Sequence, residues 1–173
     1  MIGAMADRWP GPVRILHWTT AVLALVMIPA AFAAEALTEI DTDRAETLVG
    51  VHIVAGLTIL VLTLARISAR LMLRTKPSPR QPIGAILGGL RTALFYCLLL
   101  ALPLTGILKL TLSGLDVSAF GVMLIPAGET APQFARTLNA AHAWMGKAFI
   151  ALALLHISAV LAKGLTSRRA DRR

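Results

Sequence analysis

Four long and nearly uninterrupted apolar stretches set the pattern of the sequence, at about 14–34, 48–71, 88–110 and 139–163. Each has the roughly 20 residues that an α-helix needs to cross a bilayer. A basic, Pro-rich segment at 74–82 separates the first two stretches from the last two. The pattern predicts an all-α, integral membrane four-helix bundle, and we expect residues 1–173 to form one domain.

The composition supports a membrane location. Hydrophobic residues make up 57% of the chain, charged residues only 15%, and the mean hydropathy is +0.74. A soluble domain is closer to 45–50% apolar. The surplus of apolar side chains is therefore expected to face membrane lipid.

The charged residues predict the orientation of the four spans. Basic residues precede the first span, join the second to the third and follow the fourth: Arg8, Arg14, Arg74, Lys76, Arg80, Arg91, Lys163, Arg168, Arg169, Arg172 and Arg173. The positive-inside rule then places both termini in the cytoplasm. The net charge of +8 is explained by this topology. No basic patch interleaved with aromatic residues accompanies it, so we expect no nucleic-acid partner.

The four histidines fall into two layers. His142 and His156 are 14 residues apart, which is about 40° short of four helical turns and about 21 Å along the axis. They therefore share one face of the last span, one near each membrane surface. His52 lies about one turn inside the outer end of the second span, level with His142. His17 lies about one turn inside the inner end of the first span, level with His156.

An imidazole in a membrane span can have one of three kinds of partner: a hydrogen-bonding group, a zinc ion or a haem iron. A lone histidine in a membrane helix usually hydrogen-bonds to a neighbouring helix, because an unpaired polar group there is costly. A tetrahedral zinc site needs more protein ligands than two histidines in one layer supply. A haem iron with two axial imidazoles is satisfied by each pair. Because Cys97 is the sole cysteine, the Cys-x-x-Cys-His attachment of a c-type haem is excluded.

Small and basic neighbours agree with a haem in each layer. Gly56 and Gly146 each follow a histidine by four residues, and the missing side chains would leave room for a flat macrocycle. Small residues also let membrane helices pack closely, which is the simpler explanation of each glycine alone. Arg66 and Arg14 are candidates for pairing with haem propionates at the inner layer, whereas Arg70 is equally consistent with snorkelling to the lipid surface.

With these residues in view, the chain resembles the bacterial (prokaryotic) cytochrome b561 family. The resemblance rests on "RILHW" (14–18), "VHIVAGLTILVLTLARISARL" (51–71), "LFYCLLLALPLTG" (94–106), "AFGVMLIP" (119–126) and "HAWMGKAFIALALLH" (142–156). Two departures are visible. A histidine often found four residues before the tyrosine of the third span is Thr92 here, and a histidine pair after the last span is replaced by Lys163-Gly164.

The resemblance implies a di-haem membrane cytochrome of the cytoplasmic (inner) membrane with two haem b groups. His52 and His142 would ligate the outer haem, and His17 and His156 the inner one. It also implies electron transfer to ubiquinone or another quinone. One branch of the family is a superoxide:ubiquinone oxidoreductase, which makes superoxide the leading candidate for a periplasmic one-electron donor.

The surface charges do not decide the donor. On the expected outer side, seven acidic residues outnumber four basic ones, which are Arg44, Lys109, Arg136 and Lys147. A net negative face repels superoxide unless the cations gather near the haem. Two other functional classes remain at this point: a cytochrome b subunit that passes electrons from a partner protein, and a haem-free transporter or scaffold.

Overall fold

The structure, a computed structural model, describes residues 11–72 and 82–170. This part of the chain contains α2 (Gly11–Leu37), α3 (Thr42–Met72), α4 (Pro82–Thr111), β1 (Val117–Ala119), β2 (Val122–Ile125) and α5 (Pro132–Ala170). Each predicted span lies within one helix, and all four helices are long and apolar enough to cross a membrane. The prediction of an all-α, membrane-spanning four-helix bundle is confirmed. Some of the basic residues on which the predicted orientation rests lie outside the described residues: Arg8, Arg74, Lys76, Arg80, Arg172 and Arg173.

The helices extend beyond the apolar stretches because polar residues begin them. The side chain of Asp41 accepts a hydrogen bond from the Arg44 backbone N–H at 3.1 Å, which caps α3 six residues before the apolar stretch starts. Pro132 begins α5 at the position where a helix tolerates the missing N–H of proline. Helix boundaries were therefore set by capping residues, not by hydropathy.

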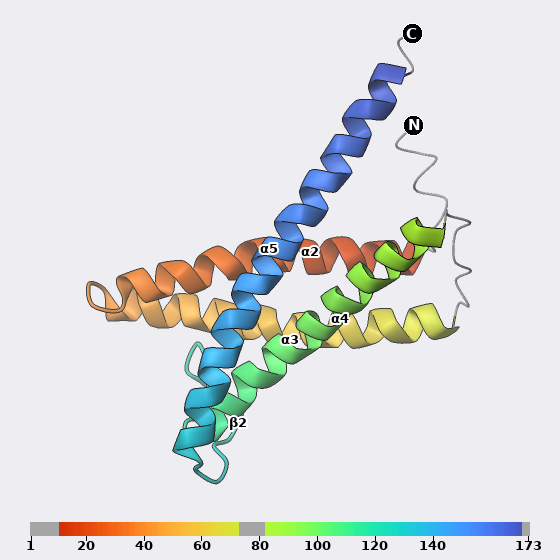
Figure 1. Cartoon of the computed structure of the whole chain (residues 1–173). Helices are drawn as coiled ribbons and strands as arrows, with labels where there is room; N and C mark the ends of the chain where they lie inside the picture. Colours follow the sequence, from red (N-terminus) through yellow and green to blue (C-terminus); the bar gives the residue numbers. More distant parts are fainter. Residues whose placement is uncertain (1–10, 73–81, 171–173) are drawn as a thin grey trace.

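The four helices alternate in direction and pack as two hairpins (Figure 1). Helices α2 and α3 lie side by side and antiparallel, whereas α4 and α5 cross them at an angle. The C-terminal end of α5, dark blue in Figure 1, projects away from the other three helices. We call the end with the 38–41 and 112–131 connections the outer end, and the opposite end the inner end.

A short β-hairpin covers part of the outer end. Strands β1 and β2 pair antiparallel, and the residues of the turn between them, Phe120 and Gly121, have φ angles of 53° and 77°. Positive φ at both positions is typical of the type I′ turns that join hairpin strands. The Phe120 ring packs on Gly50 of α3, where an added Cβ would lie 3.1 Å from the ring. The connection after α4 is thus an ordered β-hairpin, whereas the sequence predicted a partly ordered surface segment there that could cover a site.

The bundle core is a layer midway between the histidines. One buried residue from each helix forms it: Ala24, Ile59, Leu99 and Phe149. Phe149 follows His142 by seven residues and precedes His156 by seven. Ile59 follows His52 by seven. Seven residues are close to two helical turns, so these side chains share the faces that carry the histidines and separate the two layers.

Candidate functional site

The outer layer brings His52 of α3 and His142 of α5 together. Their ring centres are 6.1 Å apart and their planes are inclined at 69°. The Nδ1 atom of His142 lies 3.0 Å from the carbonyl oxygen of Leu102, and that of His52 lies 3.4 Å from the carbonyl oxygen of Met27. A carbonyl can only accept, so Nδ1 is the donor in both rings, which leaves each Nε2 to face another group.

Helix α4 contacts the His142 ring, although α4 contains no histidine. The Thr105 hydroxyl lies 3.2 Å from His142 Nδ1. An added Cβ on Gly106 would lie 3.3 Å from His142 Cε1. Toward the outer end, Lys109 Nζ donates a hydrogen bond of 3.0 Å to the side-chain oxygen of Asn139 and so links α4 to α5.

The inner layer brings His17 of α2 and His156 of α5 together. Their ring centres are 6.5 Å apart with planes at 86°. Aromatic rings flank the pair: Trp18 lies 5.5 Å from the His17 ring, and Phe95 lies 5.6 Å from the His156 ring. The buried Nδ1 atom of His156 has no hydrogen-bond partner within the part of the chain that the structure describes.

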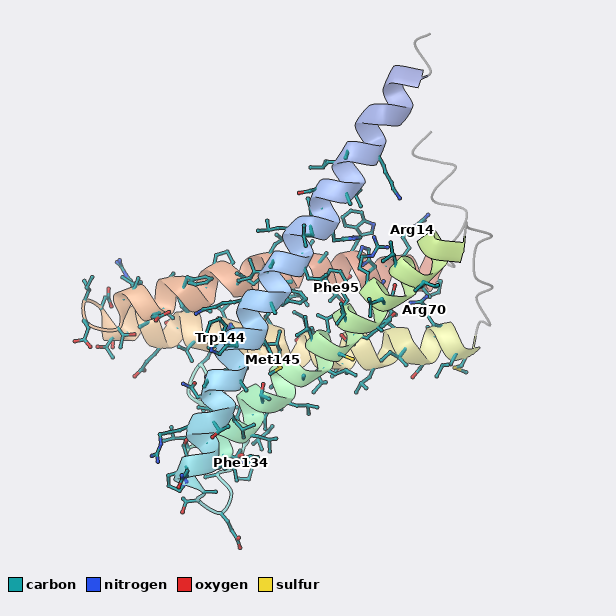
Figure 2. All side chains as sticks on the ribbon, viewed as in Figure 1. Arg14, Arg70, Phe95, Phe134, Trp144 and Met145 are labelled. Atoms are coloured by element: carbon teal, nitrogen blue, oxygen red, sulfur yellow. The ribbon has the colours of Figure 1, made fainter. Side chains whose placement is uncertain are left out.

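Cations gather beside the inner pair. The Arg66 guanidinium lies 5.6 Å from the centre of the Tyr96 ring, and that of Arg70 lies 5.8 Å from it. Arg70 Nη1 also donates a 3.2 Å hydrogen bond to the Tyr96 hydroxyl, so Arg70 turns toward α4 and not only toward lipid. Arg66 interacts electrostatically with both inner histidines. Arg14 is exposed near the start of α2, at the same end as Arg70 (Figure 2).

Both pairs have the spacing that a shared metal ion requires. A metal that binds each imidazole nitrogen at about 2 Å holds the two ring centres about 6 Å apart. The observed separations of 6.1 and 6.5 Å match this requirement. Among residues 11–72 and 82–170, no group of three or more His, Cys, Asp or Glu could hold a metal ion, which argues against zinc. Two imidazoles from opposite sides suit a haem iron.

The outer pair also has the hydrogen bonds that metal-bound histidines need. A ligating histidine almost always donates its second ring N–H to a carbonyl, a carboxylate or water, which fixes the tautomer. His52 and His142 both do so through Nδ1. The residues present therefore fit haem, and the assignment of the four histidines as ligands stays a prediction.

The glycines divide into two groups. An added Cβ on Gly146 would meet nothing within 4 Å, and one on Gly56 would meet only the Met27 sulfur at 3.8 Å. Neither position is closed by a neighbouring side chain, and the clearance role of these glycines stays a prediction. Gly106, by contrast, lies against a histidine, since an added Cβ there would be 3.3 Å from His142 Cε1.

Sequence reasoning missed Thr105 and Tyr96 as parts of the two layers. Thr105 precedes Gly106 in the Pro-Leu-Thr-Gly stretch, whose recurrence in the family motif was the available signal. Tyr96 stands in the same motif. Neither contact with a histidine or an arginine of another helix could be read from spacing along the chain, because it depends on how α4 packs on α3 and α5.

Comparisons with known proteins agree with the geometry. A family model described as prokaryotic cytochrome b561 matches residues 8–171. A search of curated protein sequences gave no match. The family match spans nearly the whole chain, including all four histidines and the helices that bring them into two layers. The chain belongs to the prokaryotic cytochrome b561 family, whose members carry haem b and transfer electrons in membranes.

Proposed function

We propose that this protein is a di-haem b-type cytochrome that carries electrons across the bacterial cytoplasmic membrane, from a periplasmic one-electron donor to a membrane quinone. The observation that carries the proposal is the pair of two-histidine layers, with ring centres 6.1 and 6.5 Å apart, on either side of one apolar core. Both termini would then lie in the cytoplasm. His52 and His142 would ligate the outer haem, and His17 and His156 the inner one.

When bound, haem b supplies one-electron chemistry at its iron, and the protein holds and tunes it. The Nδ1–H groups of His52 and His142 donate to carbonyls, which would leave both Nε2 atoms free to bind the iron. Arg66, which is half-buried beside both inner histidines, would pair with a propionate at the inner layer. Arg14, exposed at the same end, would be the second propionate partner. Gly56 and Gly146 would leave space for the macrocycle.

Superoxide is the donor that best fits the outer end. Two superoxide anions each give up one electron and leave as dioxygen, and one quinone takes up both electrons and two protons. Lys109 is half-buried and interacts electrostatically with both outer histidines. A cation in that position attracts an anion to the site even where the surrounding surface is acidic.

The other outer cations have different contacts. Arg44 Nε lies 3.1 Å from an oxygen of Asp41, so its charge is offset. Lys147 Nζ lies 4.6 Å above the exposed Trp144 ring. Arg136, the remaining outer cation, is exposed near the start of α5. Lys109 is therefore the cation on which the superoxide proposal depends.

The test is to purify the protein in detergent, record its reduced-minus-oxidised spectrum and count haem per chain. We expect a b-type spectrum and two haems per chain, followed by superoxide-dependent reduction of ubiquinone. A protein without haem would refute the proposal and favour a transporter or scaffold. Two haems without a reaction with superoxide would refute the donor alone and favour a subunit fed by a partner protein.

A further inference from the structure

We propose that Thr105 and Gly106 of α4 are positioning residues for His142, and that through His142 they set the reduction potential of the outer haem. This inference rests on the proposed function, since it takes His142 to be an iron ligand. It goes beyond that function because it assigns a role to a helix that supplies no ligand.

The hydrogen bonds around His142 admit one consistent arrangement. Leu102 O accepts from His142 Nδ1 at 3.0 Å, so Nδ1 carries the proton. The Thr105 hydroxyl oxygen, 3.2 Å from the same Nδ1, must then be a second acceptor. Its own proton is donated within α4, to the carbonyl oxygen of Ala101 at 2.8 Å or of Leu102 at 2.9 Å. His142 Nδ1–H is therefore shared between two oxygens of one helical turn.

Gly106 fixes the ring from a second direction. The His142 Cε1 atom lies where a side chain at position 106 would begin, at 3.3 Å from an ideal Cβ and with Nδ1 at 3.6 Å. Because position 106 has no Cβ, the ring lies against α4 without being displaced, with its Nδ1 3.0 Å from the Leu102 carbonyl oxygen. Two acceptors and one close backbone contact thus hold the imidazole in a single orientation.

This arrangement has an electronic consequence. Hydrogen bonds accepted from the non-ligating N–H make an imidazole a more basic ligand. A more basic ligand favours the oxidised iron, so the two acceptors lower the reduction potential of the outer haem. The hydroxyl of Thr105 is the part of this device that a substitution can remove while the backbone carbonyl stays in place.

The first test is Thr105→Val, which keeps the shape of the side chain and removes its hydroxyl. Redox titration of the purified di-haem protein should show one haem with a raised potential and the other unchanged. We expect the equilibrium constant for reduction of that haem to rise by up to tenfold, which is about 59 mV in potential for a one-electron couple. Thr105→Ser should restore the original potential.

A matched control is Thr111→Val on the same helix. Thr111 is buried, and its hydroxyl bonds to the carbonyl oxygens of Ile107 and Leu108. Loss of that hydroxyl removes the same kind of intrahelical bond, so both potentials should remain those of the unsubstituted protein.

The second test is Gly106→Ala compared with Gly89→Ala. An alanine at 106 must displace the His142 ring by a few tenths of an ångström, whereas an added Cβ at 89 meets nothing within 4 Å. In the low-temperature electron paramagnetic resonance spectrum, Gly106→Ala should shift the same low-spin haem signal that Thr105→Val shifts. Gly89→Ala should shift neither signal.

The outcomes separate this inference from the proposed function. If the unsubstituted protein holds two bis-histidine haems but Thr105→Val leaves both potentials and both resonance signals unchanged, the positioning role is refuted and the proposed function stands. Equal effects of Thr105→Val and Thr111→Val would also refute it, because they would reflect helix stability alone. An unsubstituted protein that binds no haem would overturn both.

Discussion

The two histidine layers have the same ligand set but are held by different means. In the outer layer both rings are hydrogen-bonded through Nδ1 to backbone carbonyls of neighbouring helices. In the inner layer the His156 ring packs in a T-shaped arrangement with the Phe95 ring. The Nδ1 atom of His156 has no hydrogen-bond partner among residues 11–72 and 82–170. Cations differ too: Arg66 and Arg70 meet at Tyr96 beside the inner pair, whereas Lys109 stands near the outer one.

This difference gives the two sites different electronic surroundings. Hydrogen bonds from the ligands to carbonyls favour oxidised iron, whereas nearby positive charge favours reduced iron. We therefore expect the inner site to have the higher reduction potential of the two. Electrons entering at the outer end would then move to the inner end with a favourable change in free energy, which is the direction of the proposed function.

The layers also differ in how firmly the helices enclose them. The C-terminal end of α5, which follows the inner layer, projects away from the other helices (Figure 1). Leu155 and Ile157, on either side of His156, are exposed. Regions with few buried contacts open at a lower free energy, so the inner site should release its cofactor more readily than the outer site.

The largest effect should come from removing one ligand of either layer. His142→Leu should lose the outer haem and His156→Leu the inner one, so that each purified variant holds one haem per chain. Quinone reduction should fall by more than about 100-fold, beyond what loss of a supporting hydrogen-bond partner causes. Absorbance and haem extraction measure the stoichiometry. Variants that kept both haems would show that the layers are not independent ligand pairs.

Truncation of the residue between the layers should weaken both sites together. Phe149 is 6% exposed, and its ring centre lies 6.0 Å from that of Phe95. Phe149→Ala should destabilise the bundle by about 3 kcal/mol, as large-to-small substitutions in cores do. Thermal denaturation in detergent, followed by haem absorbance, gives the change. Leu154→Ala, at a position 60% exposed on the same helix, is the control and should leave the transition unchanged.

A smaller effect should follow the loss of the inner cation. Arg66→Gln removes positive charge beside His17 and His156, which disfavours the reduced state there. The inner potential should fall by up to about 59 mV, a tenfold change for one electron, and the outer potential should hardly move. Redox titration checks this, with Arg44→Gln as control because Arg44 is already paired with Asp41. A fall in the outer potential instead would reverse the assignment of the two sites.

The smallest effect should be kinetic. Lys109→Gln should slow the reaction with superoxide by up to about fivefold, the factor that corresponds to 1 kcal/mol of interaction in water. Its rate should also depend less on ionic strength than that of the unsubstituted protein, because steering by a charge is screened by salt. Stopped-flow measurements at several salt concentrations test both points. Lys147→Gln, at a position stacked on Trp144, should behave like the unsubstituted protein.

The sequence predicted what depends on periodicity and depth. The 14-residue spacing of His142 and His156, and the level of His52 and His17 in their spans, led to the same two pairs that the structure brings together. The carbonyl partners of His52 and His142 were not predictable, because a backbone carbonyl leaves no trace in residue identity. The contacts of Thr105 and Gly106 with His142 depend on the rotation of α4, which the spacing of residues along the chain does not give.

The β-hairpin after α4 was missed for a different reason. Its strands have three and four residues, too short for periodicity to be read with confidence against four long apolar spans. The available signal was Phe120-Gly121 between two apolar runs, since a two-residue turn that contains glycine is typical of a hairpin. The exposed hydrophobic residues of β2 do not follow the helical spacing that identified the four spans.

A spacing of seven residues links each histidine to the central core. The distance between the two layers can therefore change only in steps that keep the helix faces aligned. One inserted residue in any helix would turn everything beyond it by about 100°, and a histidine would leave its layer. A matched insertion of seven residues, about 10.5 Å of helix, returns both faces to within about 20° of their original direction. The separation of the two redox sites is therefore not a continuous variable on which selection can act. Adaptation of this protein to new donors or acceptors must alter what surrounds each site and leave the distance between them unchanged.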